Sequence, residues 1–163
     1  MDPFIINLKS YKDSRGEFYE SYKDILLKKH NINFNIVQEN TCTSKKNVIR
    51  GFHYQTKPFE QAKLLTVING KIKDVLVDIR KGKSYGKIWE FNLDSKNKQL
   101  LFIPKGFAHG YSIFEDNTIV SYKTDNIYNK ISERGFNPLS LNINWGINNP
   151  ILSEKDTDLN NFS

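Results

Sequence analysis

The sequence predicts an all-β protein, a jelly-roll barrel of the cupin type with one or two short peripheral helices. Short segments rich in Val, Ile, Phe and Tyr recur along the chain, and Gly, Asn or Pro bounds them. Such regularly spaced short strands are typical of a β-sandwich or barrel, and a jelly roll is the simplest closed form. No repeat or Pro/Gly/Ser linker divides the chain, so residues 1–163 are expected to form a single domain.

Seven segments carry the strand pattern. In residues 71–80, apolar residues alternate with polar ones at Ile72, Val75, Val77 and Ile79, with one break. Asn69-Gly70, directly before this segment, is a strong signal for a hairpin turn. The seven segments are residues 33–41, 47–55, 62–70, 71–80, 86–93, 99–104 and 118–124.

The one good helical candidate runs from Ser21 to Ile32. Ile25, Leu26 and Ile32 could share one apolar face of this helix. The segment is short and stands apart from any other helical pattern, so we expect it at the periphery of the β-structure.

The formal net charge of +6 could attract nucleic acid, an anionic membrane or a small phosphorylated ligand. The lysines are scattered rather than grouped in a block, so we expect a solvated surface and neither nucleic acid nor a membrane as partner. No apolar run approaches the roughly 20 residues that cross a bilayer, and the first residues lack a signal-peptide pattern. The cytoplasm is the expected location, and the single Cys42 cannot form an internal disulfide.

Two of the three histidines, His53 and His109, lie in the strand-rich centre. Such a histidine alone is more often a hydrogen-bonded core residue than a catalyst. Residues 104–109 have the Pro-x-Gly-x-x-His spacing that many cupin barrels use, but a metal site would need more ligands than the earlier strand offers. We therefore interpret both histidines as acid–base or hydrogen-bonding groups and expect no metal. The chain has no GxGxxG or P-loop motif, and we expect no cofactor.

Longer stretches carry a specific resemblance: DSRGEFYES, VQENTCTSKKNVIRGFHYQ, QAKLLTVINGKIKDVLVDIRKGKSYG, LFIPKGFAHGYSI, SYKTDNIY and ILSEKD. In this order and over nearly the whole chain, they resemble the dTDP-4-dehydrorhamnose 3,5-epimerase family. The resemblance implies an isomerase that inverts C3, C5 or both in a nucleotide-linked 4-keto-6-deoxyhexose. The simplest such reaction converts dTDP-4-dehydro-6-deoxyglucose to dTDP-4-dehydrorhamnose, which feeds rhamnose synthesis.

The resemblance also implies catalytic roles. His53 would remove the proton next to the C4 ketone, Asp156 would orient His53, and Tyr122 would return a proton from the other face of the ring. Lys63 and His109 would stabilise the enolate, because a proton next to a ketone leaves only when the developing oxyanion is stabilised. Taken alone, Lys63 is a solvated lysine at a strand end.

Binding of the nucleotide sugar and a homodimer paired through N-terminal strands are implied in the same way. The forked donors of Arg50 suit a diphosphate, whereas Arg15, which precedes Gly16, could equally be a turn residue. The candidate substrate contacts are Arg15, Glu20, Gln38, Asn40, Arg50, Tyr128, Glu133 and Lys155.

The segment GFNPLSLNINW departs from the family, which usually has a longer stretch with an additional Trp and an Asp. The departure bears on the pocket wall and on whether both carbons are inverted. An epimerase acting at one carbon or on another nucleotide sugar therefore stays open. So do a non-catalytic cupin that binds a sugar or nucleic acid and a metal-dependent cupin oxygenase or isomerase.

Overall fold

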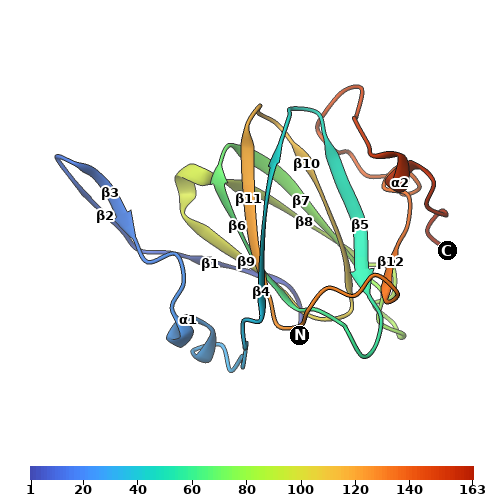
Figure 1. The fold of residues 1–163 in the computed structure, drawn as a ribbon, viewed down its shortest axis with the longest axis horizontal. Helices are drawn as coiled ribbons and strands as arrows, with labels where there is room; N and C mark the ends of the chain where they lie inside the picture. Colours follow the sequence, from blue (N-terminus) through green and yellow to red (C-terminus); the bar gives the residue numbers. More distant parts are fainter.

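The computed structural model describes residues 1–163 and has two five-stranded antiparallel sheets that face each other as a jelly roll (Figure 1). This confirms the predicted fold class. The elements are β1 (Phe4–Asn7), β2 (Ser10–Asp13), β3 (Gly16–Tyr19), α1 (Asp24–Lys28), β4 (Gln38–Ser44), β5 (Ile49–Gln55), β6 (Lys63–Asn69), β7 (Lys71–Asp78), β8 (Ile88–Asp94), the 3₁₀ turn η1 (Ser95–Asn97), β9 (Gln99–Ile103), β10 (Phe107–Ile113), β11 (Thr118–Thr124), β12 (Glu133–Gly135) and α2 (Glu154–Thr157).

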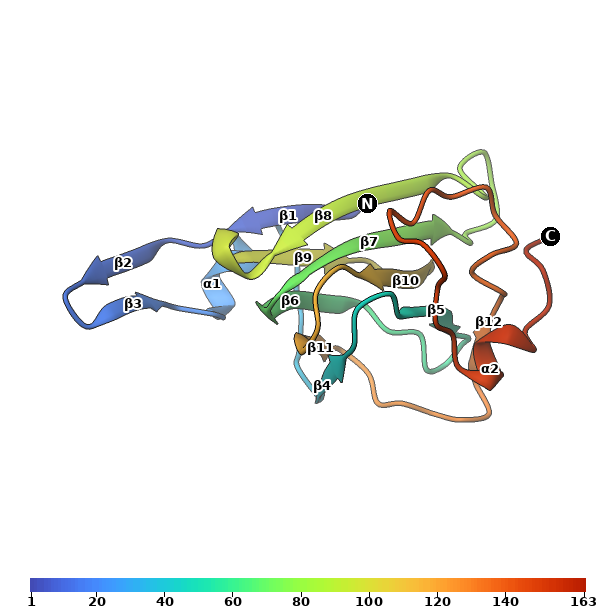
Figure 2. The same ribbon diagram turned by 90° about the horizontal axis from the view of Figure 1, so that it is seen from above.

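The strand order is β1-β9-β6-β11-β4 in the first sheet and β12-β5-β10-β7-β8 in the second. Strands β2 and β3 form a separate hairpin that extends away from the barrel in both ribbon views (Figures 1 and 2). The apolar core between the sheets contains Leu65 and Val120 from the first sheet and Ile72, Leu76 and Tyr111 from the second.

Both outer faces are also covered, so the central strands are buried on two sides. Residues near α1, including Leu27 and Phe34, pack on the first sheet. Phe136 and Trp145 pack on Val75 and Val77 of the second sheet. Both faces of β7 are therefore apolar, which explains the break in its alternation: Ile72 points into the barrel, whereas Val75 and Val77 point outward.

The prediction of a hairpin at Asn69-Gly70 is wrong. Strands β6 and β7, on either side of this pair, belong to different sheets, so the turn carries the chain from one sheet to the other. Gly70 has a φ of +84°, and a Cβ there would lie 2.2 Å from the Thr118 hydroxyl oxygen. The Asn-Gly signal thus indicated the local backbone geometry correctly, but β7 pairs with β8 and β10 rather than with β6.

The other differences concern short elements. Helix α1 spans only Asp24–Lys28, and its buried residue is Leu27, whereas Ile25 is exposed. Residues 33–37 precede β4 without forming a strand, and β10, a fully buried strand, was not among the predicted strands. The sequence GFAHGYSI has little alternation of apolar and polar residues because both faces of β10 are buried.

Neither α-helix is long and apolar enough to span a membrane.

We predict that Gly51→Ala strongly destabilises the protein. Gly51 has a φ of +109°, and a Cβ there would lie 2.4 Å from the His109 carbonyl oxygen. The control is Gly82→Ala, because Gly82 also has a positive φ, of +142°, but no atom within 4 Å of the added Cβ. Urea unfolding should show a loss of about 1–2 kcal/mol for the control and at least about 3 kcal/mol for Gly51→Ala. Equal losses would contradict the close approach of β5 and β10.

Candidate active site

The space between the sheets opens into a cavity of about 500 Å³. Both sheets and the C-terminal segment around α2 contribute to its walls. The lining residues are Cys42, Val48, Ile49, Arg50, Gly51, His53, Tyr54, Gln55, Gln61, Lys63, His109, Tyr111, Tyr122, Tyr128, Glu133, Ile151, Leu152, Ser153, Lys155 and Asp156.

An irregularity in β5 directs two functional side chains into this cavity. Arg50 and His53 both line it, although residues three apart in a regular strand point to opposite faces. The pairing of β5 with β10 shifts by one residue between His53↔His109 and Arg50↔Tyr111, as in a β-bulge. Phe52, between them, points outward into the apolar cluster with Phe136. Gly51 makes the irregularity possible, because only glycine fits against the β10 backbone there.

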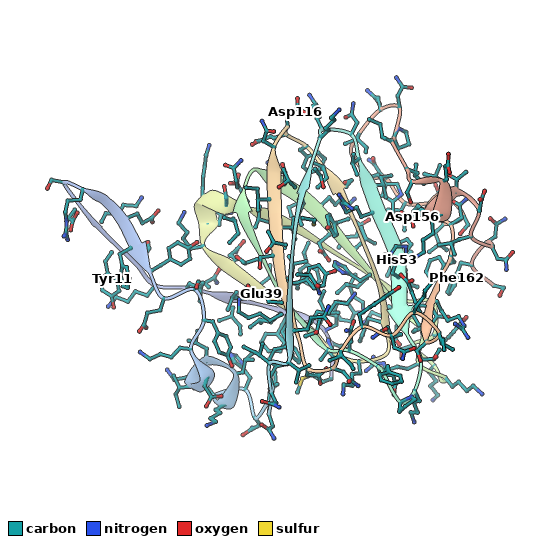
Figure 3. The ribbon with its side chains drawn as sticks, in the orientation of Figure 1. Tyr11, Glu39, His53, Asp116, Asp156 and Phe162 are labelled. Carbon is teal, nitrogen blue, oxygen red and sulfur yellow. The ribbon has the colours of Figure 1, made fainter.

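His53 forms a short hydrogen bond with Asp156. Its Nε2 lies 2.6 Å from Asp156 Oδ1, and the aspartate is almost fully buried (Figure 3). Burial acts to raise the pKa of Asp156, but the hydrogen bond from His53 and the charge of that ring outweigh it and hold the pKa below its usual value. An ionised carboxylate only accepts hydrogen bonds, so the ring carries its proton on Nε2. The Nδ1 lone pair of a neutral His53 is then free to accept a proton.

Glu133 approaches His53 from the other side. Its Oε1 lies 4.0 Å from His53 Nδ1, while its Oε2 accepts from Tyr128 Oη at 2.9 Å and pairs with Lys155 Nζ at 2.7 Å. Burial acts to raise the pKa of Glu133, but these partners hold it below the usual value. The carboxylate therefore stays charged beside His53.

A second His–Asp pair lies deeper in the same sheet. His109 Nε2 is 2.7 Å from Asp74 Oδ2, and both residues are buried. Burial lowers the pKa of His109 although Asp74 acts to raise it, so His109 is neutral at neutral pH. Asp74 was not among the residues predicted from the sequence. The feature of the sequence that could have indicated Asp74 is a polar residue two positions after Ile72, on the face of β7 that points into the barrel.

Lys63 faces these histidines from the first sheet. No carboxylate forms an ion pair with it, and its Nζ lies 5.7 Å from the centroid of the Tyr122 ring. Desolvation lowers the pKa of Lys63 to about 8, against the weaker pull of Asp74 and Glu133 in the opposite direction. The cavity thus contains a lysine that is mostly charged at neutral pH and is not neutralised by a direct partner.

Tyr122 lies on β11, in the sheet opposite His53. Burial raises the pKa of Tyr122, so its hydroxyl keeps its proton at neutral pH. A second phenol, Tyr111, is 2.9 Å from Cys42 Sγ, and burial raises its pKa well above the usual value. The cavity therefore has a potential base on one wall and a protonated phenol on the facing wall.

The other predicted contacts divide into three groups. Arg50, Tyr128, Glu133 and Lys155 line the cavity. Gln38 and Asn40 are bonded to each other at the edge of the first sheet, outside the lining, and Gln38 Oε1 accepts from the Tyr128 amide at 2.8 Å. Arg15 and Glu20 lie on or next to the projecting hairpin, where they pair with Asp13 and Lys23. The structure does not bring these two residues to the cavity of the same chain.

Gln55 is a further residue that the sequence analysis did not single out. Its side-chain amide donates to the carbonyls of Phe59 and Ile127 at 2.8 and 3.1 Å and accepts from the Asn129 amide at 2.6 Å. It therefore holds the loop that carries Tyr128. Only its place two residues after His53, on the same strand, could have indicated this role.

The chain is similar to known proteins over almost its whole length. The model of the dTDP-4-dehydrorhamnose 3,5-epimerase family matches residues 1–163. The dTDP-4-dehydrorhamnose 3,5-epimerase of Shigella flexneri is 41% identical over 167 residues, which cover 99% of this chain and 91% of that protein.

Two solved structures are similar over almost the whole chain. The dTDP-4-dehydrorhamnose 3,5-epimerase of Bacillus anthracis str. Ames, with TDP and PPi bound, has a TM-score of 0.94 and 36% identity over 99% of this chain and 94% of that one. The dTDP-6-deoxy-D-glucose-3,5-epimerase of Legionella pneumophila Philadelphia 1, in complex with dTDP-4-keto-L-rhamnose, has a TM-score of 0.92 and 36% identity over 98% and 87%.

We predict that Lys63→Met stabilises the protein at pH 7, by about 1–3 kcal/mol in urea unfolding. The folded-state pKa of about 8 lies below that of an ordinary lysine, so the cost of burying the charge is fully present below pH 8. That cost disappears as the folded protein loses the proton between about pH 8 and 10, and the gain should shrink over this range. Lys71→Met is the control, because Lys71 is exposed at the start of β7. A loss of stability at pH 7 would contradict the desolvation of Lys63.

Proposed function

This chain belongs to the dTDP-4-dehydrorhamnose 3,5-epimerase family, and we propose that its cavity converts dTDP-4-dehydro-6-deoxyglucose to dTDP-4-dehydrorhamnose. One observation carries the proposal: a histidine with a free Nδ1 and a protonated tyrosine line opposite walls of one cavity. Removal of a proton from one face and its return to the other inverts a carbon centre.

In the proposed reaction, His53 Nδ1 takes the proton from the carbon next to the C4 ketone. The electron pair of the broken C–H bond forms the C=C bond of an enolate, and the ketone oxygen becomes negatively charged. Asp156 and Glu133 stabilise the imidazolium that results. The Tyr122 hydroxyl then donates its proton to the same carbon from the opposite face, and the ketone re-forms.

The charge on the enolate oxygen would be stabilised by Lys63, with His109 beside it. A desolvated, preorganised donor of this kind contributes about 3–4 kcal/mol to the transition state. Asp74 holds His109 through Nε2, and burial keeps that ring neutral, so the full positive charge in this part of the cavity belongs to Lys63. This gives a physical reason for a lysine without an ion-pair partner in a barrel interior.

The nucleotide would occupy the outer part of the cavity. Arg50 offers forked donors for the diphosphate, and the Tyr128 ring, which is half exposed, is available to stack on the base. Once the substrate replaces their mutual ion pair, Lys155 would bind a phosphate and Glu133 a hydroxyl of the sugar. Cytoplasmic location is part of the proposal, since Cys42 lines the cavity as a free thiol.

We propose a homodimer in which the β2–β3 hairpin reaches the partner's cavity. The hairpin projects far from its own barrel and has Tyr11 and Phe18 exposed, with Arg15 at its tip (Figure 3). An arrangement of this kind would bring Arg15 and Glu20 to a nucleotide bound in the other subunit.

The proposal is tested by proton NMR in heavy water. Purified protein is incubated with dTDP-4-dehydro-6-deoxyglucose, without metal or nicotinamide, and deuterium entry at C3 and C5 is followed. Exchange at both carbons supports the 3,5-epimerase. Exchange at one carbon points to a narrower epimerase, and exchange at neither rejects the proposal for this substrate.

We predict that His53→Ala abolishes exchange at both carbons because no other group takes the proton. Tyr122→Phe should retain exchange at one carbon but lower the formation of inverted product by about 10²–10³-fold, the contribution expected of a general acid. His30→Ala is the control, since His30 is exposed and packs against Phe4 outside the cavity. Complete loss of exchange in Tyr122→Phe would contradict the division of roles.

Subunit mixing tests the shared site. Arg15→Ala should lower kcat/KM by about 10–100-fold through loss of a charged contact, and His53→Ala should be inactive. A heterodimer with one subunit of each kind, purified through two different tags, should recover about half of the wild-type activity, because one cavity would then have both residues. A heterodimer no more active than the Arg15→Ala homodimer would show that Arg15 does not serve the partner's cavity.

A further inference from the structure

We propose that Phe162 is a positioning residue for catalysis: it packs between Tyr85 and Phe136 and thereby anchors the segment that presents Asp156 to His53. Its ring centroid lies 5.4 Å from that of Tyr85, with the rings nearly parallel at 19°, and 4.8 Å from that of Phe136. Figure 3 shows Phe162 on the same side of the molecule as His53 and Asp156.

Helix α2 cannot hold Asp156 in place by itself. It has only four residues, and its single buried residue is Asp156. Isolated helices of this length are unstable in water, and burial of a carboxylate costs free energy rather than supplying it. Ser153 caps the helix by accepting from the Asp156 amide at 3.1 Å, which orients the turn but does not attach it to the barrel.

The attachment comes from the residues on both sides of α2. Before the helix, Ile151 pairs with the start of β5, where the Ile49 amide donates to its carbonyl at 3.0 Å. After the helix, Asn137 binds the Asn160 and Thr157 carbonyls at 2.8 and 3.1 Å. Phe162 then provides the aromatic anchor on this downstream side.

The same aromatic contacts also reach His53. Phe136 stacks on Phe52 with a centroid distance of 4.7 Å, and Phe52 directly precedes His53 in β5. Both partners of the 2.6 Å bond between His53 and Asp156 are thus connected to one group of rings. Further hydrogen bonds hold this group in place: the Phe162 amide donates to Ser140 Oγ at 3.0 Å, and Tyr85 Oη donates to the Ser163 carbonyl at 2.7 Å.

Removal of the Phe162 ring should therefore loosen the hydrogen bond between Asp156 and His53 without touching the cavity wall. Phe162 is not among the lining residues, so its removal would act on the substrate only through the segment that also carries Lys155. A displacement of about 1 Å in a catalytic group can cost up to 10²-fold in rate. We expect Phe162→Ala to lower kcat about 10- to 100-fold.

The experiment combines a double-mutant cycle with NMR. Exchange kinetics are measured for Phe162→Ala in the wild-type and Asp156→Asn backgrounds, with Phe162→Tyr as the conservative variant and Asn161→Ala, an exposed neighbour, as the control. Phe162→Ala should lower kcat only where Asp156 is present, and the tyrosine variant should keep at least half of the activity. In the substrate-free protein, the downfield resonance of the His53 Nε2 proton should broaden or vanish in Phe162→Ala and persist in Asn161→Ala.

An equal fall of kcat in both backgrounds, or an unchanged His53 resonance in Phe162→Ala, would overturn the proposal. Should Phe162→Ala fail to fold, Tyr85→Ala, which removes one stacking partner and leaves Phe162 in place, is judged by the same two criteria. The kinetic arm rests on the proposed epimerase function, whereas the NMR arm needs no substrate. Absence of epimerase activity in the wild type would therefore reject that function, and the resonance alone would then decide the role of Phe162.

Discussion

The contact between the backbones of β5 and β10 at Gly51 is the constraint on which the site depends. A side chain at Gly51 would overlap the His109 carbonyl, so β5 can lie this close to β10 only with glycine there. The one-residue shift at this point directs Arg50 and His53 into the same cavity and Phe52 outward. The outward Phe52 then supports the aromatic packing over the second sheet, to which the C-terminal segment is attached.

The cavity concentrates ionisable groups that would destabilise an ordinary barrel core. Two carboxylates, Asp74 and Asp156, are each matched with a histidine, and Glu133 is matched with Lys155 and Tyr128. Lys63 has no such partner, and the cost of its desolvation appears as a lowered pKa. Apolar burial between the sheets and on both outer faces offsets this cost, as expected of a site whose geometry serves a reaction rather than stability.

The distribution of these groups over the two sheets explains how a small barrel can support inversion. The histidines and their aspartates belong to the second sheet and to the segment packed against it, whereas Lys63 and Tyr122 belong to the first. A sugar ring between the sheets would meet a base on one face and an acid on the other. Each wall is a hydrogen-bonded sheet, and this holds His53 and Tyr122 on opposite sides of the cavity.

Much of this protein could be predicted from its sequence because the relevant signals are local. Short Val-, Ile- and Phe-rich segments bounded by turn residues identified the all-β class, and the motifs around His53, His109, Tyr122 and Asp156 identified the family. Gly51, within one of these motifs, showed its structural reason only in three dimensions. Strand pairing, in contrast, depends on which distant strands the whole chain brings together, so the Asn69-Gly70 turn was mistaken for a hairpin.

Tertiary structure alone decided which residues meet. Asp74 was not recognised because its strand is buried on both faces. In such a strand, the alternation of apolar and polar residues does not distinguish core residues from residues that line a site. The places of Arg15 and Glu20, far from the cavity of their own chain, follow from the direction of a hairpin that no local pattern encodes. The sequence by itself determined the family and the strand content, because both are encoded in short segments. The fold determined the distances, because contacts between residues as far apart as His53 and Asp156 depend on how the whole chain packs.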